Sequence, residues 1–176
     1  MTVRAARPAD AAALAEVAAA TFALACPPST TQEAIADFVA TTLSPERFAA
    51  YLADPARTLL VAEAQPGGPL LGYTMLVEGE PADPDVAGAL RIRPTVELSK
   101  IYVREDAHGH GTARQLLERS LDAARDRGAA GMWLGTNQEN LRAQRFYAKH
   151  GFERVGRKRF KLGDRYEDDF VFERGL

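Results

Sequence analysis

The second half of the chain alternates between stretches typical of strands and stretches typical of helices, and this order restricts the fold more than any other feature. Residues 96–103 and 132–135 are short apolar runs of the kind that forms buried strands. Residues 111–127 and 140–150 place apolar side chains at helical spacing, and a glycine follows each stretch. A strand, a helix and a strand in succession require a parallel crossover, because a tight turn cannot join parallel strands.

The remaining segments predict antiparallel strands and further helices around the same sheet. Strands are expected over 2–7, 57–63, 70–77, 152–162 and 166–173, and helices over 11–22, 32–43 and 45–52. N-caps for the last two helices are offered by Ser29, Thr30 and Thr31 and by Ser44, whereas residues 78–93 are expected to form a loop. The predicted fold class is α/β (α+β), with a single mixed, mostly antiparallel central sheet of about seven strands flanked by helices.

The composition is that of an ordinary globular domain and excludes several classes of function. The chain has 176 residues, a formal charge of −2 and 46% hydrophobic residues, which indicates one domain over 1–176 without the basic footprint of a nucleic-acid-binding protein. Residues 11–25 are rich in alanine, but Asp10 precedes them and Glu16 interrupts them, so they predict a core helix rather than a membrane or export segment. Cys26 is the only cysteine, which fits a reducing cytoplasm. We expect a cytoplasmic protein without nucleic-acid or membrane partners.

The segment 103–114 has the features of an anion site. A strand runs into a turn that contains Gly109 and Gly111, and the turn opens a helix whose first N–H groups lack partners within the helix. The alternative is a glycine turn that only permits a tight corner. A Walker loop is disfavoured because no lysine follows Gly111, and a dinucleotide fingerprint is disfavoured because Arg114 stands where its third glycine belongs.

A second informative segment covers residues 137–152. Asn140 and Tyr147 are seven residues apart and share a helix face, with the small side chain of Ala143 between them. A polar stripe with a small centre can line a groove. The alternative is an N-cap asparagine and a half-buried tyrosine without a functional role.

Together the two segments resemble the Gcn5-related N-acetyltransferases (GNAT). The family's cofactor signature, Gln/Arg-x-x-Gly-x-Gly/Ala, is similar to His108-Gly109-His110-Gly111-Thr112-Ala113, with His108 in place of Gln or Arg. The family's later pattern, Asn-x-x-Ala-x-x-Phe-Tyr-x-x-x-Gly-Phe, is matched in full by residues 140–152. Within the family, residues 97–103, 133–140 and 161–164, with Asp168 and Asp169, look closest to the PaiA-like branch, which includes polyamine acetyltransferases.

The resemblance implies acetyl-CoA as the donor and a sheet in which strands 96–103 and 132–135 form a splayed parallel pair. The pyrophosphate is expected on the backbone of the turn and first helical residues, beside His108: Gly109, His110, Gly111, Thr112, Ala113 and Arg114. The pantetheine arm is expected to pair with the strand at Ile101, Tyr102 and Val103, as a peptide adds to a sheet edge, and to accept a hydrogen bond from Asn140.

The resemblance also implies direct attack of an amine on the acetyl group, with proton transfer by two side chains. Glu97 is the candidate base that takes the proton of the acceptor, because an aliphatic amine is mostly charged at pH 7. The alternative is an ordinary exposed carboxylate on a strand. Tyr147 is the candidate acid that protonates the departing thiolate.

The acceptor is expected to be a small primary amine, and a polyamine would suit the acidic residues Glu33, Asp37 and Glu46 of the first helices. The alternatives are a solvated acidic helix face, a protein or peptide amine as acceptor, and an acyl-CoA-binding sensor without turnover. The final hairpin could pair two subunits in a homodimer.

Other patterns are weaker. The chain's three histidines, His108, His110 and His150, lack the partners of a convincing metal site, so no metal is expected. Cys26 has no sequence signature of a nucleophile. The basic run 157–161 is expected to lie opposite the acidic residues 167–169 in a hairpin, which explains it better than nucleic acid does.

Overall fold

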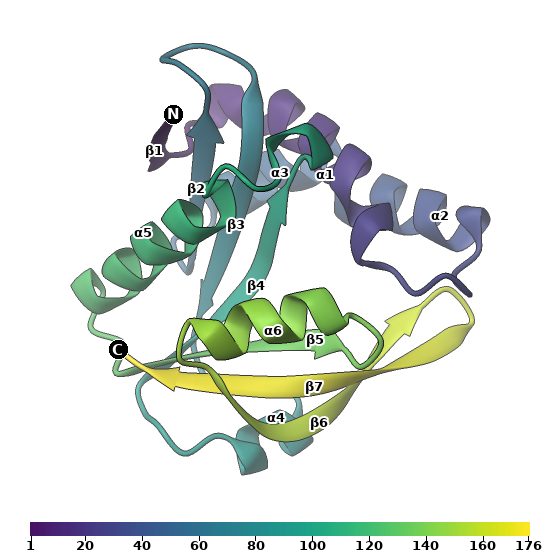
Figure 1. Ribbon diagram of the computed structural model, residues 1–176, viewed down its shortest axis with the longest axis vertical. Coiled ribbons are helices and arrows are strands. Elements are labelled where there is room, and N and C mark those ends of the chain that lie inside the picture. Colours follow the sequence, from purple (N-terminus) through teal and green to yellow (C-terminus); the bar gives the residue numbers. More distant parts are fainter.

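A computed structural model describes residues 1–176, which form one seven-stranded sheet with helices on both faces (Figure 1). The strands are β1 (Thr2–Ala5), β2 (Arg57–Glu63), β3 (Leu70–Glu78), β4 (Thr95–Val103), β5 (Gly131–Asn137), β6 (Glu153–Leu162) and β7 (Arg165–Gly175). The helices are α1 (Ala11–Ala25), α2 (Gln32–Thr42), α3 (Pro45–Ala53), α4 (Pro84–Ala89), α5 (Thr112–Asp126) and α6 (Leu141–Lys149). The strand order is β1-β2-β3-β4-β5-β7-β6, and β4 and β5 are the one parallel pair.

The predicted mixed sheet and its crossover helix are confirmed. α5 joins the two parallel strands, and the β6–β7 hairpin turns at Gly163 and Asp164. The Thr31 side chain accepts a hydrogen bond from the backbone N–H of Ala34 at 3.1 Å, and Ser44 caps α3 in the same way. β6 is an edge strand, and pairing of two subunits through the final hairpin stays a prediction.

The prediction of a loop over residues 78–93 is wrong in part, because α4 lies within it. The Asp83 side chain accepts hydrogen bonds from the backbone N–H groups at the start of α4, and Pro84 is the first helical residue. Val86 is fully buried against Trp133 and Val171. Six residues are too few to show helical periodicity, so the cap and the proline were the only local signals.

Helices cover both faces of the sheet. α1 and α3 pack on one face of β2 and β3, and α5 packs its buried Leu117 and Leu121 on the other. By length and composition alone, Pro8–Ala25 is apolar enough to cross a membrane, a test that core helices also pass. Leu14 and Ala18 of α1 have no exposed surface, so this helix packs on the sheet as predicted.

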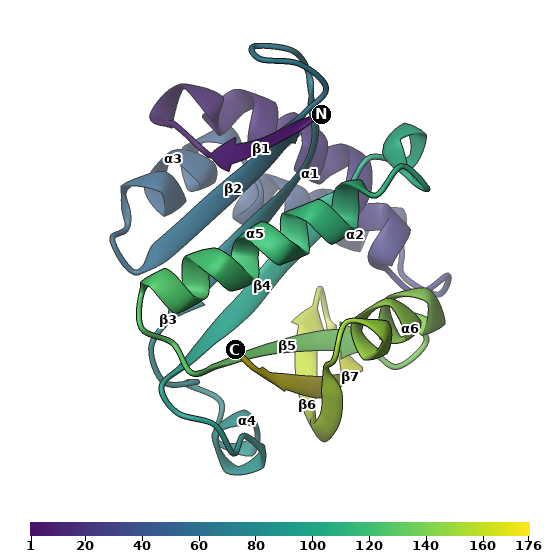
Figure 2. The ribbon, with the colours of Figure 1, turned by 60° about the vertical axis from the view of Figure 1, so that its left-hand side comes forward.

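The sheet opens between its two parallel strands. β4 and β5 pair at Thr95, Val96 and Glu97 only, opposite residues 131–133. Beyond that point β4 stays with β3 and β5 stays with β7, so the two halves of the sheet diverge (Figure 2). Ser99 has no partner in the β3 register, and this bulge bends β4 where the strands separate. The predicted splayed pair is therefore confirmed.

Candidate functional site

Two cavities adjoin where the sheet opens. The larger, which we term the α2-side cavity, measures about 240 Å³ and is lined by residues of α1, α2, β4, β5, α6, β6 and β7. The smaller, the α5-side groove, measures about 180 Å³ and lies between the end of β4, the start of α5, α6 and the end of α1. The residues that line both are Ala25, Ile101, Tyr102, Asn140, Ala143 and Tyr147. A long molecule in the groove can therefore extend its end towards the cavity.

The turn between β4 and α5 presents unpaired backbone N–H groups. Gly109 and Gly111 have φ angles of +81° and +79°, a region that residues with a Cβ atom rarely occupy. None of the N–H groups from Gly109 to Arg114 donates to a protein acceptor, and the first bond into the helix runs from Gln115 N–H to the Gly111 carbonyl at 3.0 Å. These groups lie at the positive end of a 15-residue helix, a position that favours the binding of an anion.

The side chains of this turn have separate positions. His108 lies with Nε2 2.9 Å from the carbonyl oxygen of Val103, so its ring joins the turn to the end of β4 while it lines the groove. The Thr112 hydroxyl is buried and lies 3.4 Å from the carbonyl oxygen of Ala107. Ala113 lines the groove, whereas His110 and Arg114 are exposed.

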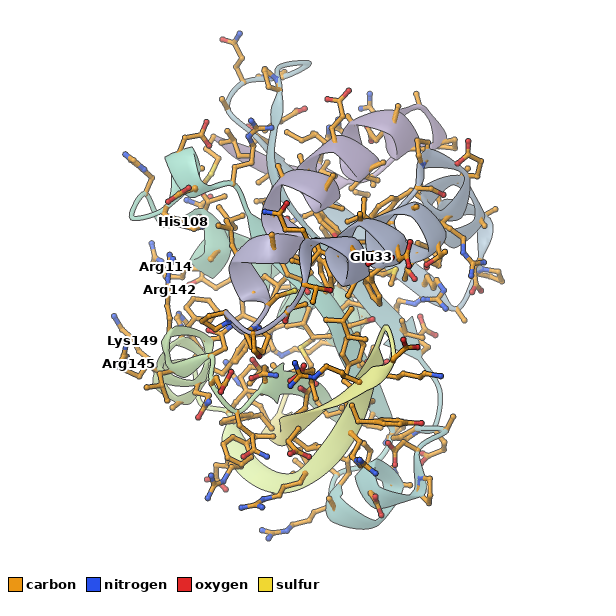
Figure 3. The ribbon with its side chains drawn as sticks, turned by 90° about the vertical axis from the view of Figure 1, so that its right-hand side faces the viewer. Glu33, His108, Arg114, Arg142, Arg145 and Lys149 are labelled. Atoms are coloured by element: carbon orange, nitrogen blue, oxygen red, sulfur yellow. The ribbon has the colours of Figure 1, made fainter.

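Basic side chains gather on the side of the molecule where the groove lies. Figure 3 shows His108, Arg114 and Arg142 on the same side of the molecule, with Arg145 and Lys149 of α6 below them. Arg142 also lines the groove, and sequence reasoning missed it. The available signal was that Arg142 lies in the first turn of the helix that Asn140 caps. If Asn140 borders the groove, the side chains of that first turn lie close to the groove as well.

α6 places Asn140 and Tyr147 on the wall that the two cavities share. Asn140 Oδ1 accepts a hydrogen bond from the Ala143 N–H at 3.0 Å, so this residue is the N-cap of α6 and its side-chain NH₂ group makes no bond within the protein. Tyr147 is 8% exposed, and its ring packs against Phe146, Phe152 and Phe172. Burial raises the pKa of Tyr147, so its hydroxyl stays protonated at neutral pH.

Five charged side chains line the α2-side cavity. They are Glu97, Lys100, Lys158, Glu167 and Asp169. Burial raises the pKa of Glu97, and it raises the pKa of Asp169 to about 6. Burial also lowers the pKa of Lys100 to about 8. All three shifts favour the uncharged form, and those of Asp169 and Lys100 bring their pKa values closer to neutral pH.

The acidic residues predicted for the acceptor site do not reach it. Glu33 and Asp37 on α2 and Glu46 on α3 are exposed, and none lines the cavity (Figure 3 labels Glu33). They form a solvated helix face, because the apolar face of each helix turns towards the core.

The charged residues that the prediction missed come mainly from the last hairpin. Lys158 of β6 and Asp169 of β7 lie opposite each other in register, as the sequence indicated for the basic run. The sequence did not indicate that this pair faces Glu97 of β4 across the opened sheet.

No group of three His, Cys, Asp or Glu side chains is arranged to hold a metal. Cys26 lines the cavity, and burial raises the pKa of its thiol to about 11, which disfavours the thiolate.

Comparison with known proteins agrees with this architecture. The model of the GNAT acetyltransferase family matches residues 23–152. An uncharacterized N-acetyltransferase of Mycobacterium tuberculosis is 47% identical over 167 residues, which are 95% of this chain and 98% of that protein.

Two solved structures with the same fold contain the donor or its product. The PaiA N-acetyltransferase of Thermoplasma acidophilum, in complex with coenzyme A, has a TM-score of 0.76 at 19% identity over 100% of both chains. The yncA protein of Salmonella typhimurium, with its cofactor acetyl-CoA, has a TM-score of 0.72 at 24% identity over 100% of this chain and 94% of that one. The likeness to PaiA is thus supported at the level of the fold. The chain belongs to the GNAT family of acetyltransferases and is an N-acetyltransferase that uses acetyl-CoA.

Proposed function

We propose that this N-acetyltransferase acetylates the primary amine of a small molecule by direct attack while both substrates are bound. The observation that carries the proposal is that the α5-side groove and the α2-side cavity share a wall at Ile101 and Tyr147. The donor would occupy the groove and the acceptor the cavity, so that the acetyl group meets the amine at the shared wall. Such positioning replaces a bimolecular encounter with a reaction between neighbours.

The residues of the groove fit acetyl-CoA. The free N–H groups of 109–114 would bind the pyrophosphate, and Arg114 and Arg142 at the mouth would add positive charge. The backbone of residues 101–103 has no partner on the β5 side and would pair with the pantetheine arm. The side-chain NH₂ group of Asn140 would donate a hydrogen bond to the same arm.

Glu97 and Tyr147 would move the protons. Acetyl-CoA supplies a thioester whose carbonyl carbon the amine attacks, which forms an amide and releases the thiol. Glu97 would take the proton that the amine loses, directly or through water, and its raised pKa makes it a better base. Tyr147 would donate its hydroxyl proton to the sulfur, since it stays protonated at neutral pH and has no hydrogen-bond partner in the protein.

The aromatic rings that line the cavity support a small acceptor rather than a protein. Phe38 of α2 stacks on Phe22 of α1 at 4.4 Å between ring centroids and meets Phe160 of β6 edge-on at 5.7 Å. These rings line the cavity and connect α1, α2 and the last hairpin above it. An extended peptide would need an open channel at that place. The carboxylates of Glu97, Glu167 and Asp169 suit an ammonium group, and polyamines are the first acceptors to test.

An acetylation assay over a panel of amines, with detection of the free thiol, tests this function. We expect turnover with small primary amines, polyamines included. Acetylation of protein N-termini alone would contradict the proposal. Thermal protection by acetyl-CoA without turnover on any amine would indicate an acyl-CoA sensor instead.

Gly111→Ala should weaken acetyl-CoA binding, because alanine is strained at a φ of +79° and the backbone of the turn must shift. We expect the Kd measured by calorimetry to rise about tenfold or more. Gly128→Ala is the matched control, since Gly128 has a φ of +85° at the far end of the same helix. Equal losses of affinity in the two variants would show that the turn at Gly111 has no specific role in binding acetyl-CoA.

Tyr147→Phe should lower kcat by about 10²–10⁴-fold, because the thiolate would leave without a proton donor. The KM for acetyl-CoA and the melting temperature should change little, since the buried ring is kept and the lost hydroxyl has no protein partner. Tyr166→Phe, at an exposed site of β7, serves as the control. Full turnover by Tyr147→Phe at every pH would exclude this residue as the acid.

Glu97→Gln should lower kcat/KM and change its pH dependence. The raised pKa of Glu97 predicts that the wild-type activity falls as pH drops through that pKa, because the protonated carboxyl cannot accept a proton. The variant should lose this acidic limb and recover as pH approaches the amine pKa of about 10.4. Glu33→Gln, at an exposed position of α2, should behave as wild type. An unchanged acidic limb in Glu97→Gln would show that another group is the base.

A further inference from the structure

The α2-side cavity contains two lysines as well as three carboxylates, and the lysines approach from opposite walls. Lys100 stands on β4 directly after the Ser99 bulge. Lys158 stands on β6, at the far edge of the sheet. Both line the cavity together with Glu97, Glu167 and Asp169. A site for a simple polycation would not be expected to hold two cations of its own.

Lys158 reaches the cavity by crossing a neighbouring strand. β6 pairs with β7 and β7 pairs with β5, yet a methyl group added at Gly135 of β5 would lie 2.8 Å from Lys158 Cε and 3.4 Å from Asp169 Oδ2. The Lys158 Nζ atom is 5.6 Å from the ring centroid of Trp133, also on β5. The absence of a side chain at Gly135 therefore provides the path by which the Lys158 ammonium reaches the opened part of the sheet.

None of these five charged side chains has a hydrogen-bond or ion-pair partner within the protein. None takes part in a hydrogen bond, or in an ion pair within 4.0 Å. Asp169 is only 8% exposed, and its carboxylate still has no donor. The charged atoms of these five side chains are not completely shielded from solvent. They therefore open onto the cavity. Partly buried charges without hydrogen-bond partners are costly, so the cavity suits a ligand that brings both signs of charge.

We propose that the acceptor is a small amino acid or a similar zwitterion, whose carboxylate binds between Lys100 and Lys158 while its amine faces Glu97. This inference rests on the proposed function and specifies its acceptor. The two lysines lie on separate strands, so a carboxylate between them would receive charge-assisted hydrogen bonds from two directions. The carboxylates of Asp169 and Glu167 line the same cavity as the two lysines. Their negative charge would repel an anion that has no amine.

Matched pairs of acceptors test the inference. Each pair consists of an amino acid and its decarboxylated amine, such as ornithine with putrescine and lysine with cadaverine. We expect kcat/KM to be at least about tenfold higher for the amino acid, because only its carboxylate meets the two lysines. A higher value for the amines would overturn the inference and leave the proposed function intact. No turnover of either class would overturn this inference, whereas the proposed function fails only if no small amine of the wider panel is acetylated.

Variants of Lys158 show whether the cavity makes the distinction. Lys158→Met should raise the KM for the amino acid about tenfold or more and leave the KM for acetyl-CoA unchanged. Lys161→Met, at an exposed site of the same strand, is the control. Gly135→Ala keeps the lysine but displaces its side chain, so it should also raise the KM for the amino acid. This variant tests the same role if Lys158→Met fails to fold. Equal preference for amino acid and amine in all four proteins would contradict the role of Lys158.

Discussion

The early end of the pairing between β4 and β5 determines the rest of the site. Three residues of each strand pair, and each strand then follows a different neighbour. Backbone groups of residues 98–103 on the β5 side are left without a ladder partner, and unpaired backbone groups are costly unless a ligand or water bonds to them. The same divergence opens the space that Tyr147 and Asn140 border. One local failure of pairing thus supplies a binding edge for the donor and a passage to the acceptor.

The features that the sequence predicted are those that depend on neighbours along the chain. Gly109 and Gly111 require a turn that other residues disfavour, and the helix that follows must expose its first N–H groups whatever surrounds it. Thr31, Ser44 and Asn140 cap helices by bonds to residues three positions later. Because these interactions close within a few residues, the crossover, the anion turn and the faces of α5 and α6 could be predicted from sequence alone.

The features that it did not predict depend on residues far apart in the chain. Lys158 and Glu97 are 61 positions apart and face one cavity only because β7 inserts between β5 and β6. Nothing near Gly135 shows that its missing side chain accommodates a lysine from the far edge of the sheet. Conversely, Glu33, Asp37 and Glu46 have the charge that an amine site needs, but helix orientation turns them to solvent. The predicted acidic residues lie on helices, whereas the carboxylates that line the cavity come from β4 and β7.

The electrostatics of the cavity follow from the same geometry. Burial shifts the pKa of Glu97 and Asp169 upwards and that of Lys100 downwards, and no hydrogen bond within the protein offsets these shifts. A site built for stability would pair these groups with one another at hydrogen-bond distance. Here they are close enough to affect each other's pKa and yet make no ion pair within 4.0 Å. Their charges are therefore free to bind a third participant, and the proposed acceptor, with an amine and an acid group, would satisfy both signs at once.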